Sequence, residues 1–105
     1  MKKVECIIPH KKFPELEIAL RQWGISGITV SEVRGFGNEQ TRPDAYLYLP
    51  KLKLEIYCGD AECEDLIAII FRICRTGNLG DGKVAVFDVH DIVRIRTGER
   101  GEVAV

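Results

Sequence analysis

Three stretches of the chain alternate apolar and polar residues, at positions 4–8, 28–36 and 51–58. Alternation with a period of two places apolar side chains on one face of an extended chain, so each stretch is predicted to be a β-strand. Pro9 is expected to end the first strand, because proline cannot continue the hydrogen-bond ladder. The third strand is expected to point three side chains inward, those of Leu52, Leu54 and Ile56.

Two other stretches repeat apolar residues every three or four positions, which predicts amphipathic helices. The first helix is expected to begin near Pro14 and to end before Gly24. Its apolar face contains Leu16, Ala19, Leu20 and Trp23. The second helix is expected to run from Asp60, a residue type favoured as an N-cap, to about Arg75.

The second helix has a wider apolar surface than one sheet contact requires. Its main stripe contains Cys63, Leu66, Ile67, Ile70 and Cys74. Ile69 and Ile73 lie beside this stripe, so either a neighbouring segment or a second subunit must cover them, and we favour the subunit.

Residues 84–87 predict a fourth strand, and residues 92–96 predict a short fifth. Residues 37–50, which are polar at first and contain two prolines, predict a loop. The resulting order, β-α-β-β-α-β, predicts an α+β, ferredoxin-like fold in which two helices cover one face of an antiparallel sheet. A length of 105 residues fits a single domain of this kind.

Charge and composition narrow the possible functions. Charged residues make up 30% of the chain but leave a net charge of only −1, which argues against non-specific binding to nucleic acid or to a membrane surface. No apolar run reaches membrane-spanning length and no signal peptide is evident, so we expect a cytoplasmic protein. In that compartment its four cysteines are expected to be free thiols. Cys58 and Cys63 are either two buried thiols or a redox-sensitive pair.

Candidate chemistry lies near the end of the sequence. Residues 76–83, TGNLGDGK, place three glycines and Lys83 within eight positions, a composition that lets backbone N–H groups surround a phosphate. The spacing matches a P-loop, but Val84 replaces the hydroxyl that would hold Mg²⁺, and a strand follows instead of a helix. Arg94 and Arg96, two positions apart, are expected to lie on one side of an extended segment and to contact phosphate oxygens.

These segments resemble the signature motifs of the PII signal-transduction proteins. Residues 76–83 resemble the B-loop of that family, residues 93–99 (VRIRTGE) its C-terminal signature, and residues 27–37 and 49–55 the strands that enter and leave its T-loop. In this chain the resemblance marks residues 37–50 as a shortened T-loop, 76–83 as the B-loop and 92–105 as the C-terminal segment.

The resemblance implies a homotrimer that binds an adenine nucleotide, ADP, AMP or ATP, in clefts between subunits. It implies that the T-loop contacts a transporter or an enzyme. The residues that it assigns to nucleotide binding are Thr29, Gly35, Gly37, Asn38, Glu55, Tyr57, Gly80, Asp81, Gly82, Lys83, Arg94 and Arg96. The same likeness leaves the requirement for Mg²⁺ and the preference among the nucleotides open.

The T-loop departs from the classical members of the family. Asn38 and Glu39 follow Gly37 where classical members have arginine and the glutamine that helps to hold Mg²⁺ and 2-oxoglutarate. A carboxylate beside a dianionic ligand is unfavourable, so this chain is expected to resemble the short-loop PII-like proteins linked to carboxysomes and bicarbonate transport. Asn38, Glu39 and Lys51 would then contact bicarbonate or another small anion. The alternative is a classical nitrogen regulator that controls ammonium uptake or glutamine synthetase.

A weak ATPase is a further alternative, but no paired acid and base or positioned nucleophile is evident in the sequence. His10 and His90 lack a sequence neighbour that would suggest a metal site, and no resident metal is expected. The sequence therefore favours a nucleotide-sensing regulator over an enzyme, and it does not name the regulated partner.

Overall fold

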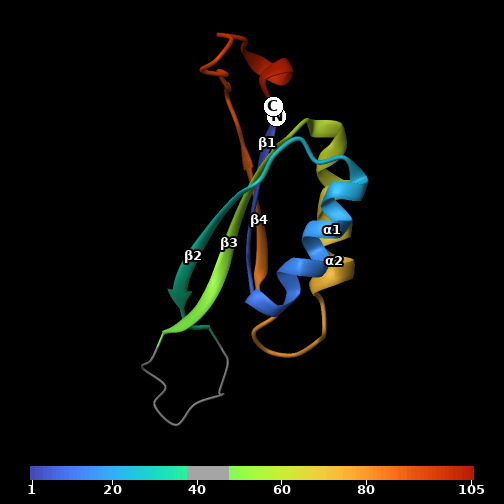
Figure 1. Ribbon diagram of the computed structural model, residues 1–105, viewed down its shortest axis with the longest axis vertical. Helices are drawn as coiled ribbons and strands as arrows, with labels where there is room; N and C mark the ends of the chain where they lie inside the picture. The colour runs from blue at the N-terminus through green and yellow to red at the C-terminus, as the bar shows by residue number, and fades with distance from the viewer. Residues whose placement is uncertain (38–47) are drawn as a thin grey trace.

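The computed structural model describes residues 1–37 and 48–105. Asn38 and Glu39, two of the expected ligand residues, lie outside this described part. The fold is an antiparallel sheet in the order β2-β3-β1-β4, with two α-helices side by side on one face (Figure 1). Its elements are β1 (Lys2–Ile8), α1 (Phe13–Trp23), β2 (Thr29–Gly35), β3 (Leu49–Cys58), α2 (Cys63–Cys74) and β4 (Lys83–Asp88). The predicted α+β, ferredoxin-like fold is confirmed.

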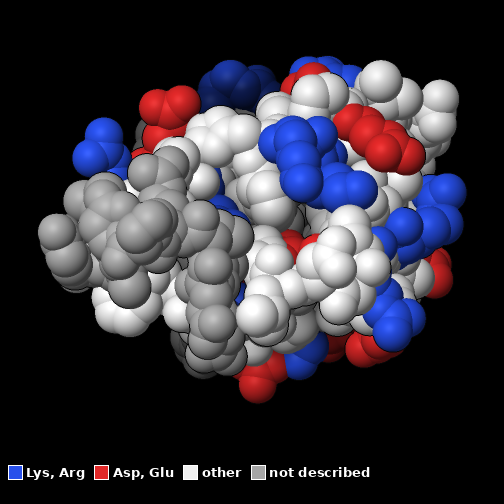
Figure 2. Space-filling model, turned by 90° about the horizontal axis from the view of Figure 1, so that it is seen from below, with Lys and Arg blue, Asp and Glu red and all other residues white. Residues whose placement is uncertain are grey.

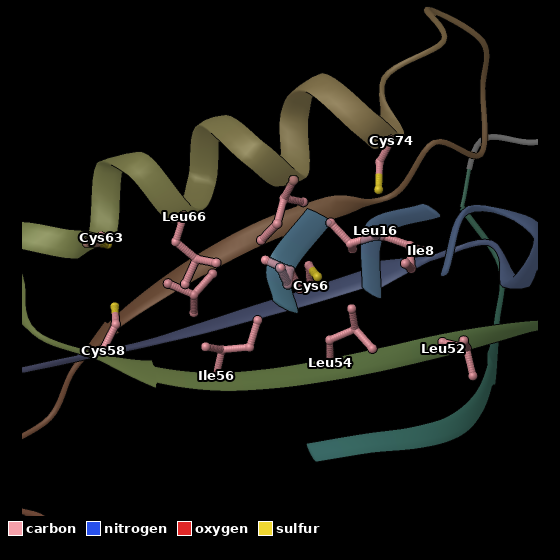
Figure 3. Packing of buried hydrophobic residues seen from close by; sticks show 13 residues of the cluster. Cys6, Ile8, Leu16, Leu52, Leu54, Ile56, Cys58, Cys63, Leu66 and Cys74 are labelled. Carbon is pink, nitrogen blue, oxygen red and sulfur yellow. The ribbon is translucent and has the colours of Figure 1, made fainter. Parts of the chain in front are cut away.

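The core lies between the two helices and the central strands. β1 and β3 are neighbours, and their alternating apolar residues point to the helix side (Figure 3). From the strands the most deeply buried side chains are Val4, Cys6, Ile8, Leu54, Ile56 and Cys58, and from the helices they are Leu16, Leu20, Leu66 and Ile70. The inward orientation predicted for Leu52, Leu54 and Ile56 is confirmed, since all three are buried.

The first helix has the boundaries that its sequence predicts. α1 begins at Phe13, with Pro14 in its first turn, where a missing N–H costs no helical hydrogen bond. Gly24 adopts φ 97°, and its N–H donates to the carbonyl oxygens of Leu20 and Arg21. A left-handed residue after the last helical position is the usual end of a helix, and glycine adopts it without strain.

The second helix differs from its prediction at the start. Asp60–Glu62 form a 3₁₀ turn, and α2 begins at Cys63. The Asp60 side chain does not cap the helix, because its Oδ1 accepts a hydrogen bond from the N-terminal ammonium of Met1 at 2.7 Å. Ile69 and Ile73, the two side chains beside the main stripe, are half-buried and pack against the core of their own chain. The expectation that a second subunit covers them stays a prediction. α1 lies alongside α2, so α2 needs an apolar surface for its neighbouring helix as well as for the sheet (Figure 1).

Strand β3 begins two residues earlier than predicted, at Leu49, and it contains Pro50. Pro50 pairs with Arg34 of β2 but lies beyond the last residue of β3 that pairs with β1, Leu52. This part of β3 has only one neighbouring strand, a position in which proline is tolerated.

The predicted fifth strand at residues 92–96 is not formed. Val93 and Arg100 make a single antiparallel bridge, and the chain turns between them. The N–H of Gly98 donates to the carbonyl oxygen of Arg94 at 2.7 Å and closes this turn. Among the described residues, no helix is long and apolar enough to cross a membrane.

Candidate functional site

The glycine-rich segment 76–83 forms the connection between α2 and β4, which we call the phosphate loop. Gly82 lies directly against β1 within this loop. A Cβ atom at Gly82 would lie 1.8 Å from the carbonyl oxygen of Ile7, and φ at this position is 102°. Only glycine satisfies both conditions, so this residue fixes the loop against β1, an inner strand of the sheet.

Asp81 faces the beginning of the same loop. Its Oδ2 accepts hydrogen bonds from the backbone N–H groups of Thr76, at 2.7 Å, and Gly77, at 2.9 Å. Its Oδ1 accepts a hydrogen bond from the Thr76 hydroxyl. The hydroxyl bond, followed by the backbone bonds, lowers the pKa of the Asp81 carboxyl below its ordinary value. The carboxylate is thus bonded inside the loop.

Several other expected ligands lie at this end of the molecule. Lys83 is the first residue of β4, and its side chain is exposed. Gly35 is the last residue of β2, and Gly37 follows it. Lys51 lies near the start of β3, and its Nζ donates a hydrogen bond to the carbonyl oxygen of Gly80 at 3.2 Å. Figure 2 looks onto this end and shows Lys and Arg side chains on its surface.

A second group of expected ligands surrounds a pocket of about 310 Å³. Thr29 of β2 and Glu55 of β3 lie directly opposite each other in the sheet register, and Tyr57 follows on the same face of β3. The Lys3 Nζ lies 3.6 Å from the Glu55 Oε2, so a cation on β1 accompanies this carboxylate. The complete lining is Ser26, Gly27, Ile28, Thr29, Glu55, Tyr57 and Val105.

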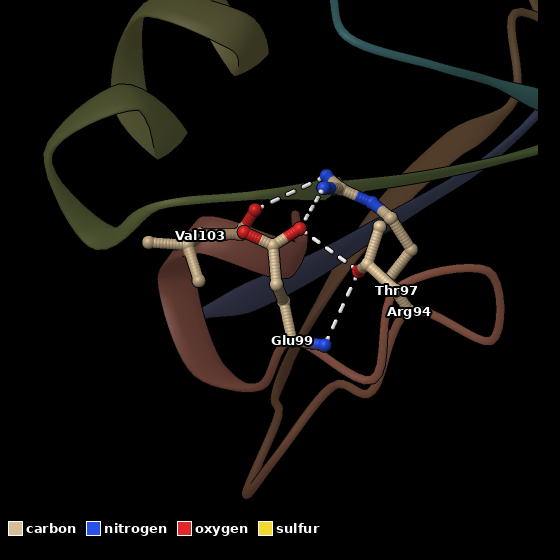
Figure 4. Close-up of polar contacts among 4 residues, drawn as sticks. All are labelled: Arg94, Thr97, Glu99 and Val103. Atoms are coloured by element: carbon tan, nitrogen blue, oxygen red, sulfur yellow. Dashed lines mark hydrogen bonds and ion pairs between the residues drawn. The ribbon is translucent and has the colours of Figure 1, made fainter.

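The two arginines of the C-terminal segment have different surroundings. The Nη1 of Arg94 lies 2.8 Å from Glu99 Oε1, and its Nη2 donates to the carbonyl oxygen of Val103 at 3.1 Å (Figure 4). Thr97 donates its hydroxyl to the same Glu99 oxygen. Arg96 lies in the exposed turn and makes no hydrogen bond or ion pair with the described residues. The expectation that Arg94 and Arg96 lie on one side of an extended segment is wrong, because the chain turns at residues 95–97.

The described structure divides the expected ligands into two separate groups within one chain. The phosphate loop ends at Lys83, the first residue of β4, and Arg94 lies beyond the last residue of this strand (Figure 1). Five steps along β4 correspond to about 17 Å. Thr29 and Lys83 belong to the two edge strands of the sheet, which are about 14 Å apart across three strand spacings. One chain alone therefore does not bring the two groups together.

All four cysteines are buried. Burial, and next the adjacent Cys63 thiol, raise the pKa of Cys58 to about 11. The Cys58 thiol therefore rarely ionises near neutral pH, which favours its interpretation as an unreactive buried thiol. Within the described residues, no group of three or more His, Cys, Asp or Glu side chains is arranged to hold a metal ion.

Sequence reasoning missed three contacts at these sites. They are the Lys3–Glu55 ion pair, the Thr76–Asp81 hydrogen bonds and the contact of Gly82 with the Ile7 backbone. The first had a signal, since alternation already places Lys3 and Glu5 on the polar face of the first strand. The Thr76–Asp81 hydrogen bonds had a weaker signal, because a negatively charged residue is unexpected in a loop whose glycines and lysine suit a phosphate. Nothing in the sequence indicated the third.

Comparison with known proteins identifies similar sequences over the whole chain. The family model described as "Nitrogen regulatory protein P-II" matches residues 1–99. The nitrogen regulatory protein P-II of Mesorhizobium japonicum is 42% identical, and that of Pasteurella multocida is 41% identical. The nitrogen regulatory protein P-II 1 of Escherichia coli is 40% identical. Each alignment covers 100% of both sequences. These names favour the nitrogen-regulatory alternative over the expected role in inorganic-carbon metabolism, for which the comparisons give no support.

Proposed function

This chain belongs to the nitrogen regulatory protein P-II family, and we propose that it senses an adenine nucleotide and transmits the bound state to a partner in nitrogen metabolism. The observation that carries the proposal is the phosphate loop. Gly82 lies against the Ile7 carbonyl and Lys83 is exposed beside it. A glycine-rich loop of this kind is able to present backbone N–H groups to an anion. The net charge of −1 makes a local anion site more consistent with this chain than a broad basic surface.

The nucleotide would occupy a cleft between two subunits. In this arrangement Thr29, Glu55 and Tyr57 of one copy surround the base, and the C-terminal arginines of that copy extend to the phosphates. Gly80, Gly82 and Lys83 of the neighbouring copy hold the phosphates from the other side. The separation of these groups within one chain supports a site that requires two copies, and a closed ring of three copies would contain three such sites.

Signalling would proceed through residues 37–50, the proposed T-loop. Gly37 is the first residue of this loop and Lys51 directly follows its last residue, and Lys51 also contacts the phosphate loop through Gly80. A ligand at the phosphate loop would therefore act on the residue that fixes the end of the T-loop. We propose that the T-loop contacts a transporter or an enzyme of nitrogen metabolism.

The co-ligand of the nucleotide distinguishes the nitrogen role from the carbon role. Asn38 and Glu39, together with Lys51, would contact it. We propose nitrogen regulation as the role, because the relatives have that name, and the two co-ligands to compare are 2-oxoglutarate and bicarbonate. Mg²⁺ is included in the comparison, since it bridges phosphate and carboxylate oxygens in many nucleotide sites.

Isothermal titration calorimetry tests the proposal. ATP, ADP and AMP are titrated separately into the purified protein, each with and without Mg²⁺, 2-oxoglutarate or bicarbonate. We expect saturable nucleotide binding that Lys83→Ala weakens by about 1–3 kcal/mol, the range for loss of a charged hydrogen-bond partner. Arg72→Ala is the matched control, because this exposed cation lies on α2 outside both groups of expected ligands.

Three results would contradict the proposed function. Absence of binding for all three nucleotides would exclude nucleotide sensing. Steady phosphate release from ATP that Lys83→Ala abolishes would instead indicate an enzyme. A change in nucleotide affinity with bicarbonate but not with 2-oxoglutarate would return the assignment to inorganic-carbon metabolism.

A further inference from the structure

We propose that Asp81 is a positioning residue that holds the phosphate loop in its anion-binding form without contacting the nucleotide. The inference rests on the proposed function, because it assigns a role within the same site. The Asp81 carboxylate is negatively charged and repels the phosphates of a nucleotide. We therefore expect Asp81 to make a favourable contribution to the loop that offsets this repulsion.

The hydrogen bonds of Asp81 indicate what it provides. The two carboxylate oxygens accept from the N–H groups of Thr76 and Gly77 and from the Thr76 hydroxyl, four or five residues earlier in the chain. The Thr76 hydroxyl in turn accepts a hydrogen bond from the N–H of Asn78 at 3.2 Å. Asp81 and Thr76 therefore connect the beginning of the loop to its end and close it as a ring of side-chain and backbone contacts.

The next residue limits the orientation of this ring. Gly82 lies against the Ile7 carbonyl, so the end of the loop is fixed to β1 while Asp81 draws the beginning toward it. Both oxygens of the carboxylate have donors inside the loop. The charge-assisted bonds reduce the negative charge that a phosphate would meet, and the exposed Lys83 side chain adds a positive charge at the other side of Gly82.

A loop already closed in the free protein loses less conformational freedom when a phosphate binds, which increases affinity. The contribution should therefore depend on the phosphate groups. Replacement of Asp81 should weaken binding of ADP, whereas adenosine, which lacks phosphate, should bind as it does to the unaltered protein.

The test uses two substitutions at this position with opposite expected effects. Asp81→Ala removes every acceptor, and we expect ADP affinity to fall at least about tenfold, the equivalent of one lost strong hydrogen bond. Asp81→Asn keeps an oxygen that can accept from Thr76 and Gly77 but has no negative charge. We expect its ADP affinity to equal or exceed that of the unaltered protein.

Thr76→Val tests the same contact from its other end, at a residue without charge. The substitution keeps the shape of the side chain and removes the hydroxyl, so ADP affinity should also fall. Because both residues act through one contact, the double variant Asp81→Ala/Thr76→Val should be little weaker than Asp81→Ala alone. Full additivity of the two losses would contradict the proposal.

Other outcomes overturn the inference in identifiable ways. Unchanged or increased ADP affinity in Asp81→Ala would mean that the carboxylate only repels the phosphates. An equal loss in Asp81→Asn and Asp81→Ala, measured with and without Mg²⁺, would mean that the carboxylate contacts the nucleotide or its metal ion directly. An equal loss of adenosine binding would mean that the substitution disturbs the whole fold.

Hydrogen exchange measures the loop without any nucleotide. The N–H groups of Thr76 and Gly77 should exchange faster in Asp81→Ala than in the unaltered protein, while those at the centre of β1 keep their rates. Failure of the unaltered protein to bind any of ATP, ADP and AMP would contradict the proposed function, whereas unchanged exchange at these two amides in Asp81→Ala would contradict the role of Asp81.

Discussion

At the scale of single residues, the two halves of the proposed site each contain a carboxylate that is bonded within the chain. Asp81 closes the phosphate loop, and Glu99 accepts from both Arg94 and Thr97 in the C-terminal turn. Asp81 and Glu99 are thus explained in motifs expected to bind a polyanion, because each accepts hydrogen bonds from donors within the chain. The remaining exposed cations, Lys83 and Arg96, are then the residues from which direct phosphate contacts are expected.

The first prediction concerns Gly82. Gly82→Ala should destabilise the protein by about 2 kcal/mol or more, because a Cβ would overlap the Ile7 carbonyl and strain a backbone with positive φ. Urea unfolding monitored by circular dichroism measures the loss. Gly27→Ala is the control, since an added Cβ there meets no atom within 4 Å and φ is not positive. Equal stability of the two variants would contradict the packing described for Gly82.

The second prediction separates the two arginines. Arg96→Ala should weaken ADP binding by about 1–3 kcal/mol and leave the melting temperature unchanged, since Arg96 has no partner among the described residues. Arg94→Ala should weaken binding and also lower the melting temperature, because Arg94 connects Glu99 to the Val103 carbonyl. Calorimetry and thermal unfolding provide the two measurements. If ADP affinity is unaltered in both variants, neither arginine belongs to the site.

At the scale of elements, helix α2 contacts both the sheet and α1. The residues at its centre face β1 and β3, while Ile69 and Ile73 pack beside them on the same core. Its opposite side includes Phe71, which is 57% exposed and lies under the Arg75 guanidinium. The end of α2 leads directly into the phosphate loop, so the packing of this helix determines where the loop begins.

The third prediction compares the two sides of α2. Leu66→Ala should reduce the free energy of unfolding by about 2–5 kcal/mol, because the buried side chain would leave a cavity in the core. Phe71→Ala, on the exposed side of the same helix, should cost much less. Chemical unfolding of both variants at low protein concentration makes the comparison. A larger loss for Phe71→Ala would show that this side is covered in the folded protein.

At the scale of the whole molecule, the sheet register separates the two groups of expected ligands. The phosphate loop precedes β4, the arginines follow it, and Thr29 belongs to the opposite edge strand. A nucleotide that contacts both groups must therefore lie between two copies of the chain. Size-exclusion chromatography with light scattering should give the mass of a trimer for the proposed assembly.

The fourth prediction tests the shared site by complementation. Lys83→Ala removes the phosphate-loop cation, and Arg96→Ala removes the arginine of the other group, so each variant alone should bind ADP weakly. Mixed oligomers refolded from both variants contain some interfaces where the intact loop of one chain meets the intact arginine of another. We expect these to restore strong binding in a fraction of the sites.

The complementation experiment has a direct control. Each variant refolded alone at the same total concentration should show no strong sites. Restoration of strong binding only in the mixture requires a site built from two chains. A complete lack of restoration in confirmed mixed oligomers would place the lysine and the arginine in the same chain's site.

The sequence by itself was sufficient for β1 to β4, for the two α-helices, for the α+β fold and for the family. Alternation in β1 and β3 and the helical spacing of α1 and α2 are local consequences of burying one face, and they can be read without tertiary contacts. The phosphate loop and the arginine motif were equally visible, because their residue types and spacing are unusual in a chain of nearly balanced charge.

Only the tertiary structure decided how these segments are used. Asp60 accepts a hydrogen bond from the N-terminal ammonium, a partner distant in sequence, and does not cap α2. Ile69 and Ile73 pack against the core of their own chain. A turn replaced the predicted fifth strand, and the strand order placed Thr29 and Lys83 on opposite edges of the sheet. Such outcomes depend on which groups meet in space, and local propensity contains no information about partners that come from remote parts of the chain.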